Sequence, residues 1–139
     1  MCLIVNSPKM IAETDLAVYK ILEKDNNNFL TPYKKCSIQF ENGQFFQVMD
    51  GEKVLDLDFI YIEKGIHAYY RENTAKEKNA ILNEASSFLT FKVHYAVIPK
   101  GCEYCLGIED EIVSTDMIIF ETDEDYRKYK RKHKVKPVK

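Results

Sequence analysis

The segment from Phe88 to Ile98 most constrains the fold, because apolar side chains occupy every second position over much of its length. An extended strand places such side chains on one face. The odd-numbered residues from Phe91 to Val97 are all apolar or aromatic, and a two-residue period puts them on one face of a strand. Pro99-Lys100-Gly101 follows and is expected to end the strand, since proline and glycine interrupt strand pairing. A strand of this length needs partners, so we expect a sheet.

Other segments supply candidate partners. Glu13 to Lys24 is compatible with a helix or a strand, and its β-leaning centre favours a strand. Asn42-Gly43 is a strong hairpin signal and predicts that the two segments flanking it pair with each other. The strands expected elsewhere, including the two of this hairpin, are Cys36 to Phe40, Gln44 to Met49, Leu57 to Ile62, Glu111 to Ser114 and Met117 to Glu121.

One main helix is predicted from Asn73 to Ala85, where apolar residues recur at helical spacing and Asn73 could act as the N-cap. A short polar helix is possible from Glu124 to Lys132. We find no internal repeat and no linker rich in Gly, Pro or Ser. The pattern predicts an α+β fold with a mostly antiparallel sheet, organised as one domain over residues 1–126 and a basic tail over residues 127–139.

Charge is distributed unevenly along the 139 residues. The formal net charge is −2, but residues 1–126 carry 12 basic and 22 acidic side chains, whereas the tail carries eight basic side chains and no acidic one. An acidic body argues against a broad nucleic-acid surface, so only the tail could supply such a contact. The other interpretation of the tail is a solvated, partly frayed end. No apolar run is long enough to span a membrane.

Four cysteines are present, at positions 2, 36, 102 and 105. The first residues lack a basic leader and a long apolar run, so we expect reduced thiols in a cytoplasmic protein. Cys102 and Cys105 have the spacing of half a zinc site, which Cys36, His67 or His94 could complete, but no second pair has ligand spacing, and we predict no metal. Exposure of Cys2 by removal of Met1 would create an N-terminal nucleophile, an alternative that the chain length disfavours.

Four short motifs occur in order: Val18-Tyr19-Lys20, Gly65 to Tyr69, Pro99-Lys100-Gly101 and Glu109-Asp110-Glu111. Their order and spacing resemble the layout of the ADP-ribosyltransferase fold from about Leu16 to Phe120. The resemblance implies NAD as substrate and Glu111 as the key carboxylate, with Glu109 orienting an acceptor from the same strand face. The chain departs from that family in two places, because Lys20 replaces an arginine fork and His67-Ala68-Tyr69 replaces hydroxyl residues. A solvated acidic turn is the other interpretation of the two glutamates.

A second pattern covers nearly the whole chain. Met1-Cys2-Leu3, Val18-Tyr19-Lys20, Gly65 to Tyr69 and Ile98 to Gly101 resemble segments of uncharacterised proteins from phages and mobile elements of gut Bacteroidetes. This resemblance implies an origin, and binding of a host protein or a nucleotide signal as the kind of activity. It implies no particular chemistry.

His67 is the side chain most suited to binding, because it follows a glycine and has tyrosines on either side that could stack on an aromatic ligand. A histidine that fills the end of a β-core is the alternative. We expect a binding protein without a cofactor, whose ligand is a nucleotide-like small molecule or a host protein. The ligand-binding residues predicted are Tyr19, Lys20, His67 and Tyr69. NAD-dependent transfer by Glu111 and a purely protein-binding module are the alternatives.

Overall fold

The computed structural model describes residues 3–26, 28–32, 37–49, 55, 61–62, 64–86 and 88–139. The strands are β1 (Leu3–Ile4), β2 (Met10–Ile11), β3 (Asp15–Asp25), β4 (Asn28–Leu30), β5 (Ser37–Ile38), β6 (Gln44–Val48), β7 (Tyr61–Ile62), β8 (Ile66–Tyr69), β9 (Thr90–Ile98), β10 (Glu103–Leu106), β11 (Glu111–Ser114), β12 (Asp116–Phe120) and β13 (Val135–Pro137). The helices are α1 (Glu72–Ala85) and α2 (Asp123–Lys132), with a 3₁₀ turn, η1, at Ile108–Asp110. The expected α+β class is therefore confirmed.

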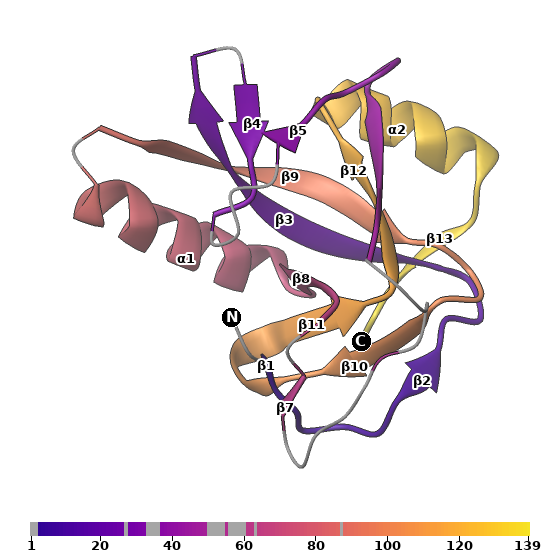
Figure 1. Cartoon of the computed structure of the whole chain (residues 1–139). Coiled ribbons are helices and arrows are strands. Elements are labelled where there is room, and N and C mark those ends of the chain that lie inside the picture. The colour runs from indigo at the N-terminus through magenta and orange to yellow at the C-terminus, as the bar shows by residue number, and fades with distance from the viewer. Residues whose placement is uncertain are drawn as a thin grey trace.

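Eleven of these strands form one sheet, whose main path runs β2-β10-β11-β8-β3-β9-β12-β6. Neighbours along this path pair antiparallel, as expected. The long strands β3 and β9 cross the middle of the molecule side by side (Figure 1), with registers from Leu16↔Ile98 to Lys24↔Thr90. The strand predicted from alternation and the strand favoured by its β-leaning centre thus form the centre of the sheet.

Both helices pack on the same face of the β3–β9 pair. The Tyr95 hydroxyl on β9 donates a hydrogen bond to Glu72 Oε2 of α1 at 3.1 Å. The Tyr95 ring also stacks on Tyr126 of α2, with centroids 4.6 Å apart. α2 begins with a capping box, in which the Thr122 hydroxyl accepts from the Asp125 N–H and the Asp125 carboxylate accepts from the Thr122 N–H. Such a cap contributes about 1 kcal/mol.

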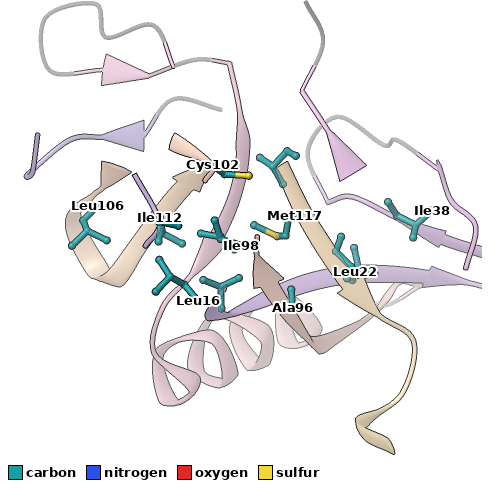
Figure 2. Close-up of a cluster of buried hydrophobic side chains, with 14 residues drawn as sticks. Leu16, Leu22, Ile38, Ala96, Ile98, Cys102, Leu106, Ile112 and Met117 are labelled. Atoms are coloured by element: carbon teal, nitrogen blue, oxygen red, sulfur yellow. The ribbon is translucent and has the colours of Figure 1, made fainter. Parts of the chain in front are cut away.

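The opposite face of the sheet covers the largest core cluster. Leu16 and Leu22 of β3, Ile98 of β9 and Met117 of β12 point toward one another, and Ile112 of β11 joins them (Figure 2). The sheet path brings these residues together because β11 and β12 follow one another in the chain but lie on opposite sides of the β3–β9 pair. Burial of such side chains stabilises the fold by roughly 1.5–3 kcal/mol each.

The predicted hairpin is only partly correct. Its turn exists: Asn42 and Gly43 have φ values of 53° and 79°, and Glu41 and Gln44 exchange backbone hydrogen bonds. Beyond that single bridge the strands separate, because β5 pairs with β4 and β6 pairs with β12. A turn depends on the residues within it, whereas the partner of a strand depends on which apolar side chains become buried when the sheet forms. The expected strand from Leu57 to Ile62 lies mostly outside the described residues.

The tail is not a frayed end. The expected boundary at residue 126 falls inside α2, and β13 pairs with β3 as its parallel neighbour, with registers Val135↔Asp15 to Pro137↔Ala17. The expected main helix is α1, of 14 residues, and the possible short polar helix is α2, of 10 residues. The N-cap of α1 is Arg71, not Asn73. Within the described residues, neither helix is long and apolar enough to cross a membrane.

Candidate functional site

A discontinuity along one edge of β3 creates the candidate site. This edge pairs first with β13, then with β8 at the single position Tyr19↔Tyr69, and then with β4 from Glu23 onward. The register leaves Lys20 to Leu22 between β8 and β4. A cavity of about 60 Å³ opens at this position, and we call it the β3/β8 cavity. It exists because two neighbouring strands diverge from the same partner.

The β3/β8 cavity brings together four of the six residues singled out from the sequence. Lys20, His67, Tyr69 and Glu111 all line it, together with the less polar Ile21, Pro32, Ala68 and Leu82. Tyr69 and Glu111 are register partners on β8 and β11, so their side chains lie on the same face. Residues 91 positions apart in the sequence therefore meet in one small cavity, because β8 joins β3 to β11.

Lys20 is buried, with 7% of its surface exposed. Its Nζ donates a hydrogen bond of 2.5 Å to the His67 carbonyl oxygen, which ties β3 to β8 just beyond the point where their backbones separate. A buried ammonium requires such partners, since leaving it unsatisfied in a low dielectric costs several kcal/mol. Lys20 thus acts in part as a structural bridge, and its charge lies inside the protein.

Glu111 is half-buried at the start of β11. Burial raises the pKa of its carboxyl above the ordinary value, the nearby Glu109 raises it further, and Lys78 opposes both effects. The carboxylate is therefore partly desolvated and gains from any ligand that donates hydrogen bonds to it. Glu111 is the one carboxylate among the described residues that line the cavity.

Glu109 does not share a strand face with Glu111, so that prediction is wrong. Glu109 lies in η1 with φ 56°, and its carboxylate pairs with Lys78 Nζ at 3.1 Å on the surface. Spacing of two places side chains together only on a continuous strand, and here the chain turns before β11 begins. The two carboxylates are therefore electrostatic neighbours without a shared face.

Sequence reasoning missed Asp110, which lies between these glutamates. Its backbone is left-handed, with φ 62°, and its carboxylate accepts hydrogen bonds from the Thr74 hydroxyl at 2.5 Å and from Arg71 Nε at 3.2 Å. Thr74 lowers the pKa of Asp110 most strongly, with Arg71 adding to the effect. Asp110 thus attaches the start of α1 to the start of β11. An aspartate that tolerates left-handed backbone was the available signal.

Tyr19 does not line the β3/β8 cavity. Its ring lies 5.7 Å from that of Tyr95, on the face that carries the helices, and Tyr95 in turn stacks on Tyr126. Burial and the charge of Glu72 raise the pKa of Tyr19. Tyr19 is the register partner of Tyr69, so the two side chains lie on the same face of the sheet, but Tyr19 is not among the residues that line the cavity. The prediction that Tyr19 joins Lys20, His67 and Tyr69 in one pocket is therefore not met.

The two described cysteines are separate thiols. Cys102 and Cys105 are buried and form no disulfide with each other, and they belong to different core clusters. Burial raises the pKa of the Cys105 thiol, which disfavours the thiolate that reacts or binds metal. Among the residues that the structure describes, no group of three or more His, Cys, Asp or Glu is placed to hold a metal. Cys2 and Cys36 lie outside those residues.

The β3/β8 cavity can accept hydrogen-bond donors at Glu111, and the Tyr69 ring offers an aromatic wall. Its volume is far below the roughly 300–1,000 Å³ that encloses a whole ligand of drug size, so it suits one small head group. Comparisons with protein-family models, with curated proteins and with solved structures returned no match to this chain. The resemblances to ADP-ribosyltransferases and to phage proteins therefore stay predictions.

Proposed function

We propose that this protein is a binding module for a nucleotide-like small molecule, whose base presents its hydrogen-bonding edge to Glu111 at the β3/β8 cavity. The observation that supports this is the half-buried Glu111 carboxylate, which lies opposite Tyr69 across two paired strands and in the same cavity as His67. A nucleobase presents an aromatic face for a tyrosine and an edge of N–H groups for a carboxylate. The sugar and phosphate would remain outside the small cavity.

The chemistry of Glu111 favours one class of base. A carboxylate accepts two hydrogen bonds, so it matches a base edge with two adjacent donors, as guanine has at its ring N–H and exocyclic amine. Adenine offers one exocyclic donor beside a ring acceptor, and that acceptor faces the carboxylate unfavourably. Because the pKa of Glu111 is raised by burial, a ligand that donates to its ionised form also lowers that pKa toward the ordinary value.

Isothermal titration calorimetry with guanosine monophosphate and adenosine monophosphate tests this proposal. Guanosine monophosphate should bind, and Glu111→Gln should weaken it by about tenfold or more, since a paired carboxylate and base are worth about 1–3 kcal/mol. Glu109→Gln is the matched control, because it removes the same charge from an exposed surface pair. Equal affinity of the two variants, or no binding of either nucleotide to the wild type, would contradict the proposal.

The alternative of NAD-dependent ADP-ribosyl transfer fits this geometry less well. The β3/β8 cavity does not accommodate a dinucleotide, and the Lys20 ammonium that would contact its phosphates donates to the His67 carbonyl. Incubation with radiolabelled NAD distinguishes the two ideas. The transferase hypothesis requires label transfer that Glu111→Ala abolishes, whereas the binding hypothesis requires weaker nucleotide uptake in His67→Ala and no transfer in the wild type.

A protein-binding function is a second candidate, and the edge of the sheet favours it. β6 ends the main path of the sheet, and Phe46 and Val48 on it remain 53% and 45% exposed. An edge strand with large apolar side chains can add a strand from a partner. If no nucleotide binds and Glu111→Gln is silent, Phe46→Ser together with Val48→Thr is the variant to test for loss of a host partner in pull-down experiments.

A further inference from the structure

A large groove lies away from the β3/β8 cavity, where β2, the β9–β10 turn and the C-terminal end of the chain meet. Its volume is about 1260 Å³, and Figure 1 shows these segments along the same side of the molecule. Four lysines line it: Lys100, Lys132, Lys134 and Lys136. We call it the basic groove. Nothing in the proposed nucleotide binding uses it.

Tertiary pairing creates the basic groove. β13 lies parallel to the start of β3, and this folds the lysines of the tail back onto the body. The Thr14 hydroxyl donates to the Lys134 carbonyl at 3.0 Å, and the Lys100 N–H donates to Asp15 Oδ1 at 2.9 Å. Adjacent residues at the start of β3 therefore hold Lys134 and Lys100, which are 34 positions apart in the chain.

The positive charge of the basic groove is available to a ligand. All four lysines are exposed, and none makes an ion pair with a residue that the structure describes. Of the two acidic residues in the groove, Asp15 already accepts hydrogen bonds from the Lys100 N–H and, at 2.7 Å, from the Tyr129 hydroxyl. Glu13 is the other. The groove is thus cationic, although residues 1–126 carry a net charge of −10.

The floor of the basic groove is apolar and aromatic. Ile11 on β2 lines the groove and is 63% exposed. Tyr104 on β10 is half-buried and lines the groove together with its register partner Met10. Lysines around an aromatic and apolar floor form the arrangement that binds single-stranded nucleic acid, because the cations contact phosphates and the ring stacks on a base. A duplex needs a broader cationic surface, which the acidic body does not provide.

We propose that the basic groove binds single-stranded nucleic acid, with Lys100, Lys134 and Lys136 on phosphates and Tyr104 against a base. An acidic peptide would use the same lysines but would gain nothing from base stacking on Tyr104. The tail alone does not explain the site, because Lys100 belongs to the β9–β10 turn. The contribution of Lys100 distinguishes a folded groove from a disordered basic tail, which would attract any polyanion.

Fluorescence anisotropy with a labelled oligothymidylate of about 12 nucleotides, inside the usual site size of roughly 4–16 nucleotides, measures this binding. Lys100→Ala combined with Lys136→Ala should weaken it about tenfold or more. The slope of log K against log salt should fall by about 1.4, or about 0.7 for each lost phosphate contact. Lys128→Ala combined with Lys130→Ala is the matched control, since these lysines belong to the same tail but do not line the groove.

Tyr104→Leu keeps an apolar side chain in the β10 position and tests stacking. It should weaken binding about fivefold or more without changing the salt slope, because base stacking on an aromatic ring is worth about 1–3 kcal/mol. Thermal unfolding of each variant identifies any that fail to fold, and Lys100→Ala alone, on an exposed turn, then serves instead of the double variant. The proposal would be overturned by equal losses of affinity in the groove and control variants, or by an unchanged affinity in Tyr104→Leu. It would also be overturned if duplex bound more tightly than the single strand, or if polyglutamate of equal charge displaced the oligonucleotide.

Discussion

The β3/β8 cavity and the basic groove both contain lysine, and they use it in opposite ways. Lys20 is buried and donates to the His67 carbonyl, so its charge helps to hold two diverging strands together. The groove lysines are exposed and make no ion pair with a described residue, so their charge is open to a ligand. The difference shows that tertiary position decides whether a cation is part of the scaffold or part of a binding surface.

Alanine substitutions at two glycines, one beside each region, should give the largest difference in the free energy of unfolding. Gly65 (φ +130°) leads into β8, and a Cβ there would lie 2.5 Å from Val113 Cγ2. Gly101 (φ +92°) follows Lys100, and a Cβ there would meet nothing within 4 Å. We expect Gly65→Ala to destabilise the fold by about 3 kcal/mol, from overpacking and backbone strain together, and Gly101→Ala by about 1 kcal/mol from strain alone.

Urea unfolding of the two alanine variants measures this difference. A larger loss at Gly101 than at Gly65 would mean that the β8 side is the more adaptable of the two regions. The β3/β8 side would then be packed less tightly than the groove side, and the contrast between a buried scaffold and an open surface would fail.

Asp110 provides the next largest effect, on the β8–α1 side of the β3/β8 cavity. Asp110→Ala removes acceptors from Thr74 and Arg71, and we expect a loss of about 2 kcal/mol, since bonds to a charged group are worth about 1.5–3. Glu109→Ala is the control, because its exposed ion pair with Lys78 contributes about 0–1 kcal/mol. Chemical denaturation at neutral pH measures both, and equal losses would show that Asp110 has no special structural role.

The buried His94, on β9 opposite Lys20 of β3, should make the stability of the fold depend on pH. His94 is the register partner of Lys20 and is 2% exposed, with its Nδ1 hydrogen donated to the Phe120 carbonyl at 2.9 Å. Burial lowers the pKa of His94 below its ordinary value of 6.5. The neutral ring therefore contributes stability that is present above pH 6.5 and is lost as the pH falls through the lowered folded pKa.

We expect the wild type to lose about 1 kcal/mol for each pH unit below 6.5 until that folded pKa is passed. His94→Phe, which keeps a ring between Phe29 and Phe40, should flatten this dependence. His133→Gln is the control variant, a histidine substitution at an exposed position at the end of α2. Thermal unfolding between about pH 7.5 and about pH 5, roughly the range in which histidine titrates, measures the slope. An unchanged slope in His94→Phe would contradict the assignment.

The smallest effect on stability should come from the basic groove itself. Lys134→Ala combined with Lys136→Ala should change the free energy of unfolding by no more than about 0.5 kcal/mol, since exposed substitutions away from structural features usually do little. The same variant should lose oligonucleotide binding. A large loss of stability would mean that these lysines belong to the scaffold, as Lys20 does, and would remove the contrast between the two regions.

Local patterns in the sequence predicted the longer elements correctly. Alternation located β9 and helical spacing located α1, both within a few residues of their observed bounds. The short strands β1, β2, β4, β8, β10 and β13 were not predicted. Strand partners were predicted less well, since the Asn42-Gly43 turn forms while β5 and β6 pair elsewhere. The period of a segment depends on its own residues, whereas its partner depends on which apolar faces can be buried together.

The candidate site follows the same division. The sequence by itself determined which side chains are present, and it led us to predict Tyr19, Lys20, His67 and Tyr69 as ligand-binding residues and Glu111 as the carboxylate of the enzyme alternative. Only the tertiary structure decided that Lys20, His67, Tyr69 and Glu111 line one cavity, that Tyr19 packs beside Tyr95, and that Lys100 joins the tail lysines in one groove. The physical reason is that strand pairing around β3 brings distant parts of the chain together. β8 and β4 diverge from one edge of β3, and β13 pairs with the same edge, so residues far apart in the sequence become neighbours in space.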